Sequence, residues 1–67
     1  MNADEWREAR TGEPVIITDS GGIPCGAGTI ADKTGPAVAM VKVGEISGRP
    51  ILRFTYISYL RRIIHHE

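Results

Sequence analysis

Cys25 and the two histidines near the end of the chain are the residues whose types could support covalent catalysis. A cysteine thiolate beside a histidine base forms a nucleophilic pair, and Cys25 with His65 or His66 could supply one. No local nucleophile signature surrounds Cys25, and a lone cysteine is usually a small buried hydrophobe. The pattern therefore favours no catalytic residue and a role without enzymatic activity.

The same histidines, together with Glu67, are the residues that most resemble a metal site. Adjacent residues on a strand point to opposite faces, so His65 and His66 cannot both reach one ion. The glycines of the middle segment fit neither the phosphate-binding loop nor the dinucleotide fingerprint, since no helix pattern follows them; they are Gly21, Gly22, Gly26 and Gly28. We expect neither a metal nor a cofactor.

Basic and aromatic residues gather in the second half of the chain, which is the mixture that binds single-stranded nucleic acid on small barrels. The members are Lys42, Arg49, Arg53, Tyr56, Tyr59, Arg61 and Arg62. A charged sheet edge that suppresses aggregation has the same composition. The net charge of zero also weighs against nucleic acid as the main partner. Nucleic-acid binding is therefore the alternative hypothesis.

The overall composition indicates one soluble domain spanning residues 1–67. The hydrophobic content of 42% is too high for a disordered chain, and no run approaches the ~18 apolar residues of a membrane span. Cys25 is the only cysteine, and the N-terminal residues are too acidic for a secretion signal. We expect a cytoplasmic protein that does not bind membranes. Because so short a chain builds only a thin core, we also expect it to gain stability by association.

Residues 2–11 are predicted to form one short helix. Asn2 is suited to the N-cap, and Glu5 three positions later completes a capping box. Gly12 and Pro14 then end the helix. Trp6 is its only large apolar side chain, so it either plugs an open end of the core or serves as a partner-binding anchor.

Residues 14–65 are predicted to form the β-rich part of the domain. β-Branched residues and glycine-marked turns place strands at 15–18, 26–31, 37–43, 49–55 and 61–65, with a hairpin loop at 44–48 and a single 3₁₀ turn within 56–60. Glycines inside a strand usually mark bends, which let a small sheet curl and close.

Alternation along the strands predicts which side chains face the core. On the third strand Lys42 is assigned to solvent together with Val38 and Met40, which leaves Ala39, Val41 and Val43 facing inward. On the fourth strand Arg53 is assigned to solvent with Ile51 and Thr55. The predicted core residues of the C-terminal part are then Leu52, Phe54, Ile57 and Leu60.

This arrangement resembles the small SH3-like β-barrels of bacteria. The resemblance covers residues 12–64 and is carried by Gly12-Glu13-Pro14-Val15-Ile16-Ile17, Gly26-Ala27-Gly28-Thr29-Ile30, Val41-Lys42-Val43 and the stretch from Phe54 to Ile63. It implies a mainly β fold, a five-stranded SH3-like barrel with a short N-terminal helix and a 3₁₀ turn before the last strand. Sm-like barrels also place a helix before five strands and are the competing resemblance. Fold resemblance alone implies no function.

Apolar side chains remain on both sides of the predicted strands, which is more than one core face requires. Contiguous exposed apolar area usually marks an interface. We therefore expect a protein-binding module that associates with itself or with a larger partner, through Trp6, Val38, Met40, Ile51, Arg53 and Ile64. A third hypothesis is an enzyme whose pore or shared site is formed by oligomerisation.

Overall fold

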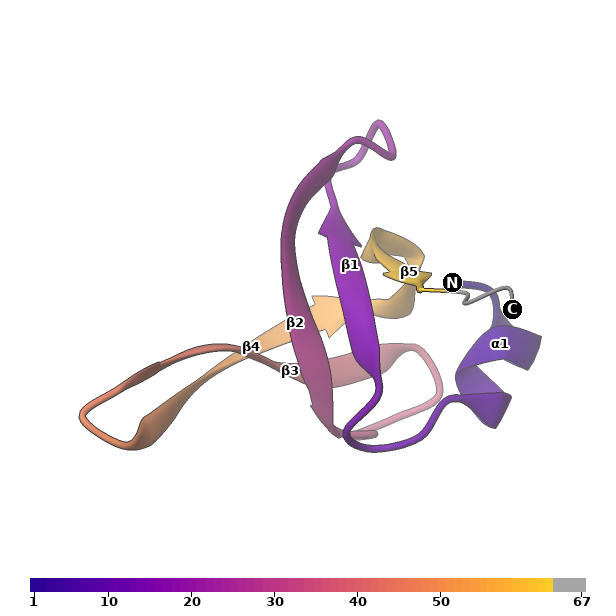
Figure 1. The fold of residues 1–67 in the computed structure, drawn as a ribbon. Helices are drawn as coiled ribbons and strands as arrows, with labels where there is room; N and C mark the ends of the chain where they lie inside the picture. Colours follow the sequence, from indigo (N-terminus) through magenta and orange to yellow (C-terminus); the bar gives the residue numbers. More distant parts are fainter. Residues whose placement is uncertain (64–67) are drawn as a thin grey trace, which may run out of the picture.

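The computed structural model describes residues 1–63 as one helix, five strands and a 3₁₀ turn (Figure 1). In chain order the elements are α1 (Ala3–Glu8), β1 (Pro14–Thr18), β2 (Pro24–Asp32), β3 (Val38–Ile46), β4 (Arg49–Tyr56), η1 (Ile57–Tyr59) and β5 (Leu60–Arg62). The prediction of a mainly β chain with a leading helix and a 3₁₀ turn before the last strand is confirmed. Ile64, His65, His66 and Glu67, to which several predictions refer, lie outside the described residues.

The five strands form one sheet in the order β4-β3-β2-β1-β5. Every neighbouring pair is antiparallel. The chain runs through the hairpins β1–β2, β2–β3 and β3–β4, and η1 then carries it across to the far side of β1, where β5 pairs. β4 and β5 are therefore the two edges of the sheet.

Helix α1 is capped as the sequence predicts but is shorter than predicted. Asn2 Oδ1 accepts a hydrogen bond from Glu5 N at 2.8 Å, and Glu5 Oε1 accepts one from Asn2 N at 3.0 Å. The chain turns extended at Ala9, whose side chain is buried in the core. Gly12, with φ of 91°, is in the following turn and donates its N–H to Ile30 O instead of capping the helix. The helix therefore ends at Glu8, before Gly12.

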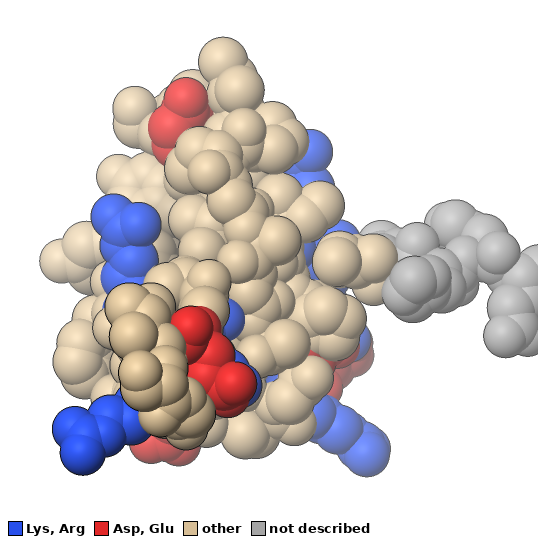
Figure 2. Space-filling view, turned by 60° about the vertical axis from the view of Figure 1, so that its left-hand side comes forward, with Lys and Arg blue, Asp and Glu red and all other residues tan. Residues whose placement is uncertain are grey.

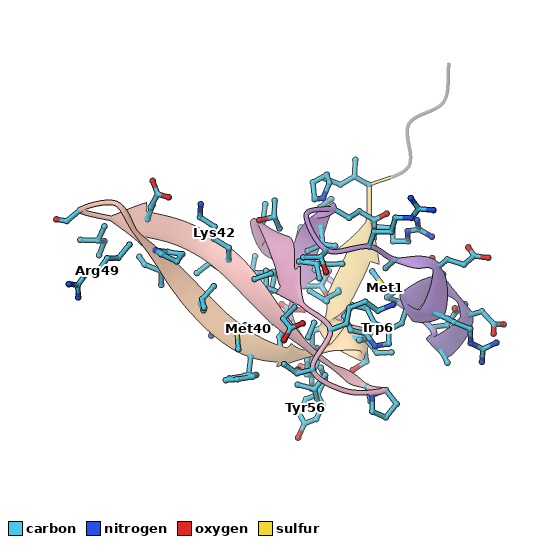
Figure 3. The ribbon with its side chains drawn as sticks, turned by 90° about the horizontal axis from the view of Figure 1, so that it is seen from below. Met1, Trp6, Met40, Lys42, Arg49 and Tyr56 are labelled. Carbon is cyan, nitrogen blue, oxygen red and sulfur yellow. The ribbon has the colours of Figure 1, made fainter. Side chains whose placement is uncertain are left out.

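The helix is held against the sheet by Trp6 and by the chain terminus (Figure 3). The Trp6 side chain is buried, and its Nε1 donates to Gly35 O at 2.8 Å. Lys33 Nζ lies 4.9 Å from the centre of the indole ring, which adds a cation–π contact. The amino group of Met1 donates to the carbonyl oxygens of Ile57 and Leu60. Trp6 therefore occupies the role of a core plug.

The core combines Trp6 with small and medium side chains from the segment after α1 and from β1, β2, β3, η1 and β5. Its buried members are Trp6, Ala9, Val15, Ile17, Ile30, Ala39, Val41, Ile57 and Leu60, with Val43 packed against them. The inward assignments of Ala39, Val41, Ile57 and Leu60 are thus confirmed. No residue of β4 is buried. This strand therefore widens the sheet by one strand but contributes little to the core.

One-residue irregularities bend the sheet. On β2 the pairing skips Cys25 on the β1 side and Ala31 on the β3 side, and on β3 it skips Val43. An extra residue bends the strand that carries it and increases its twist. The long strand β2 is visibly curved in Figure 1, which brings the β1–β5 and β3–β4 parts of the sheet around a common core.

Gly28 lies where two strands approach too closely for any side chain. A Cβ atom there would stand 2.5 Å from Lys42 O and 2.6 Å from Val41 Cγ1. At Gly26, on the same strand, a Cβ atom would meet nothing within 4 Å. The two glycines of β2 are therefore not equivalent.

We expect Gly28→Ala to lower the free energy of unfolding by about 1–3 kcal/mol, because the backbone of β3 must move to admit the methyl group. The control Gly26→Ala should change stability by less than ~1 kcal/mol, since its methyl group meets open space. Urea denaturation followed by circular dichroism measures both variants. Similar losses for the two would contradict the close approach of β2 to β3.

Candidate interaction surface

The outer face of the β3–β4 hairpin carries exposed apolar side chains from β4 beside half-buried apolar side chains from β3. Directly opposed residues of an antiparallel pair share a face, and Met40 opposes Phe54 while Val38 opposes Tyr56. We call this set the outer apolar surface; its members are Val38, Met40, Leu52, Phe54 and Tyr56. Phe54 is 65% exposed and Tyr56 is 62% exposed. Contiguous exposed apolar patches are uncommon on monomeric soluble proteins, so this surface is the candidate interaction site.

The shape of the molecule leaves this surface open. The hairpin extends away from α1 and the body of the sheet (Figure 1). Figure 2 views the molecule from the side of the hairpin tip, and uncharged residues cover most of the face it shows. In Figure 3 the Tyr56 side chain extends away from the sheet. The aromatic groups of β4 therefore face outward.

The outward position of Leu52 and Phe54 corrects the sequence prediction, which placed both in the core. Val43 is an extra residue on β3, so that Lys42 opposes Leu52 and Gly44 opposes Ile51. Without the extra residue, Lys42 would oppose Arg53, and the two would share one face, the solvent face to which the prediction assigned each of them. A one-residue shift of register moves every side chain of a strand to the other face.

The sequence prediction placed residues 44–48 in an unpaired hairpin loop, so it did not include the bulge at Val43. The observed turn has only Ser47 and Gly48 at its centre, with φ of 52° and 77°. Positive φ at both central residues is the geometry of a tight two-residue hairpin turn. Pairing therefore continues from Gly44 to Ile46. Gly44, a glycine inside a strand, was the sequence signal that could have revealed the bulge.

The inner face of β4 borders an open groove of about 600 Å³. Arg53 opposes Val41 across the hairpin, and so lies on the face that carries the core. The groove lies between β4, η1 and the end of β1, and its lining includes Arg53, Tyr59, Thr18 and Cys25. Val38, Phe54 and Tyr56 of the outer apolar surface also line it, so side chains of both faces of β4 reach the groove. The Tyr56 and Tyr59 rings meet edge to face with centroids 6.3 Å apart. The groove thus combines aromatic walls with one guanidinium group.

Asp19 also lines the groove, but its carboxylate is occupied by the turn after β1. Asp19 Oδ1 accepts hydrogen bonds from Gly21 N at 2.8 Å and Ile23 N at 3.0 Å. Cys25 is exposed and free, whereas the histidines proposed to activate it are outside residues 1–63. In that part of the chain no three potential metal ligands come together. The described groove therefore supplies no assembled acid–base or metal chemistry.

The predicted protein-interface residues do not lie on one surface. Val38 and Met40 are on the outer face, whereas Ile51 and Arg53 belong to the opposite face of β4. Trp6 is buried under α1, and Ile64 lies beyond the described residues. The structure brings Val38 and Met40 together with Phe54 and two further β4 residues that the interface prediction lacked.

The predicted basic set is also dispersed. Arg49 lies at the hairpin tip and points away from the body (Figure 3), whereas Arg61 lies on β5 at the opposite edge and donates to Gly22 O at 3.2 Å. Lys42 Nζ is paired with Glu45 Oε1 at 3.0 Å. Arg53, Tyr56 and Tyr59 of this set meet in the groove. Arg61 and Arg62 line a separate pocket beside Ser58 and Leu60.

Arg62 has a structural partner instead of a free surface. Its Nη2 donates to Glu13 Oε1 at 2.8 Å, and Nη1 lies 3.6 Å from Glu8 Oε2. The hydrogen bond to Glu13 raises the pKa of Arg62, against a smaller lowering by burial. Glu13 Oε2 is buried and has no partner among the described residues. Arg62 therefore ties β5 to the segment that precedes β1.

No protein-family model, no curated protein and no solved structure significantly matches this chain. In residues 1–63 the structure contains no helix long and apolar enough to cross a membrane. The chain is a small antiparallel β-sheet domain.

We expect Arg62→Ala to lower the midpoint of thermal unfolding more than the control Arg61→Ala does. Without the guanidinium group, the largely covered Glu13 carboxylate loses its partner, whereas Arg61 makes only an exposed contact. Because the pKa of Arg62 is raised, its contribution is complete at neutral pH and is lost only as the pH rises through that raised value. Circular dichroism melts at pH 7 and pH 9 should give the same ranking. Equal losses for the two variants would contradict this assignment.

Proposed function

We propose that this chain is a non-enzymatic interaction module with the architecture of a small SH3-like barrel, which binds protein through the outer apolar surface and associates with itself. The strand order β4-β3-β2-β1-β5 and the 3₁₀ turn between β4 and β5 support the SH3-like architecture. The observation that carries the function is the exposure of Phe54 and Tyr56 beside Met40.

The energetics favour covering this surface. Burying a large apolar side chain completely is worth about 1.5–3 kcal/mol, and more than half of Phe54 and Tyr56 is still exposed. A chain of 67 residues has little core with which to offset this exposure. Covering the surface with protein would stabilise both the interface and the fold, as small domains often require. A larger protein partner is the other occupant that this surface fits.

Binding of single-stranded nucleic acid is the second candidate, supported by the meeting of Arg53, Tyr56 and Tyr59 in one groove. Stacking aromatics beside a cation suit exposed bases. The pairing of Lys42 with Glu45 and of Arg62 with Glu13 leaves this candidate few free cations. Its signature is an affinity that falls steeply as the salt concentration rises.

Light scattering after size exclusion tests self-association. The wild-type chain should have a molar mass that is a multiple of 7.3 kDa, and Phe54→Ser should shift it toward the single-chain value. The monomeric variant should still fold, because Phe54 lies outside the core, and its circular dichroism spectrum should remain that of the wild-type chain. Ile23→Ser is the matched control, since Ile23 is 64% exposed but lies in the β1–β2 turn.

Two results would count against the proposal. A wild-type chain that stays at 7.3 kDa up to millimolar concentration would contradict self-association. An oligomer that responds equally to the Phe54 and Ile23 variants would contradict the outer apolar surface as its contact.

A further inference from the structure

The outer edge of β4 is an unpaired strand edge eight residues long. Natural proteins normally shorten, charge or cover such edges, because free N–H and C=O groups invite another strand. The opposite edge, β5, spans only three residues. β4 is therefore the edge of this sheet that is best suited to extending it.

The backbone groups that face this open edge belong to the same residues that carry the outer apolar side chains. Ile57 N donates to Ala37 O at 3.0 Å, directly beyond the last β3–β4 pair. Hydrogen-bonded and non-hydrogen-bonded pairs alternate along an antiparallel ladder. Because Ile57 faces β3, every second residue before it on β4 also does. The main-chain N–H and C=O groups of Arg53 and Thr55 therefore face β3, whereas those of Leu52, Phe54 and Tyr56 face the open edge.

We propose that a second copy of this chain pairs antiparallel with β4 along this edge, about a two-fold axis at Phe54. This inference rests on the proposed self-association and specifies its contact. Phe54 then opposes Phe54 of the second copy, and Leu52 opposes Tyr56. Each of these pairs exchanges N–H···O=C hydrogen bonds in both directions. Two-fold symmetry makes the contact self-complementary and closed, so association stops at the dimer.

Pro50 and Arg53 select this register over its neighbour. An axis at Arg53 would place the two Arg53 side chains opposite each other, which like charges disfavour. It would also place Pro50, which has no N–H, opposite Tyr56. An axis at Phe54 instead places Arg53 opposite Thr55, and Pro50 lies outside the paired stretch.

A shift of the axis in the other direction is also disfavoured. With the axis at Thr55, Leu52 would oppose Ser58, which belongs to the 3₁₀ turn η1 and not to the strand. The ladder would then lose its last pair. The axis at Phe54 is therefore the register that pairs Leu52, Phe54 and Tyr56 within β4 and leaves Pro50, which has no N–H, outside the ladder.

The area available on the edge matches what a small specific dimer needs. An aromatic side chain presents about 150–250 Å², so the exposed fractions of Phe54 and Tyr56 leave roughly 100–150 Å² on each ring. Four such rings supply about half of the ~1,000 Å² that a specific interface buries. Leu52, 46% exposed, and the main chain of β4 add to this. Because opposed residues share a face, the outer apolar surfaces of the two copies join into one stripe.

Disulfide trapping tests the register. In a Cys25→Ser background, Phe54→Cys places two thiols on opposed, hydrogen-bonded residues, whose Cα atoms lie ~5.5 Å apart. That distance is within the range that a disulfide spans. Loss of the ring weakens association in this variant too, but each disulfide that forms removes two chains from the monomer–dimer equilibrium. At millimolar protein, oxidised glutathione should therefore convert most of this variant to a covalent dimer, seen on a non-reducing gel and lost on reduction.

Two controls in the same background define the contact. Ile23→Cys is equally exposed but off the edge, and should give at least tenfold less covalent dimer. Arg53→Cys lies on β4 but opposes Thr55 in this register, so its two copies are displaced diagonally and should also couple slowly. Equal coupling at positions 54 and 23, or faster coupling at 53 than at 54, would overturn the inference.

Sedimentation of the wild-type chain separates this inference from the broader proposal. If the wild-type chain is a dimer and position 54 does not couple, self-association stands and the β4 register is wrong. If the wild-type chain is a monomer at millimolar concentration, both are wrong. Dimeric wild-type protein together with selective coupling at position 54 is the result we expect.

Discussion

The extra residue in β3, Val43, determines the arrangement of the rest of the surface. It shifts the pairing of β4 by one position, so that Arg53 opposes Val41 and Phe54 opposes Met40. A shift of one residue exchanges the two faces of a strand. The face of β4 that bears aromatic side chains is thereby turned away from the core, and side chains of both faces border the groove. The exposed apolar surface follows from this bulge and not from a shortage of polar residues.

The interior is complete without β4. Trp6 closes one end of the core from α1, where its indole N–H reaches Gly35 O. Gly28 allows β2 and β3 to approach, and Arg62 ties β5 to Glu13. The β3–β4 hairpin extends from this body with no buried β4 residue. The chain thus separates a small packed core from a protruding apolar strand, a division of the kind expected when a domain completes itself by association.

The sequence predicted the number and order of the elements because local signals were strong: the Asn2–Glu5 capping box, the β-branched run of β1 and the glycine-marked turns. It also predicted the inward side chains of β3, which have a clear alternation. It assigned the side chains of β4 to the wrong faces. Apolar residues lie on both faces of this strand, and the bulge at Val43 decides which of them face the core. For the surface, Met40 and Val38 were predicted, whereas Phe54 was assigned to the core. Long-range pairing, which no local pattern encodes, decided that difference.

Amide hydrogen exchange in the unmodified protein tests most directly whether β4 is an interface. In a single chain the N–H groups of Leu52, Phe54 and Tyr56 face the open edge and should exchange rapidly, whereas those of Arg53 and Thr55 are bonded to β3 and should exchange slowly. Raising the protein concentration from micromolar to millimolar should slow exchange selectively at 52, 54 and 56, because hydrogen-bonded amides exchange only when the pairing opens. Rapid exchange at these three positions at every concentration would contradict the account.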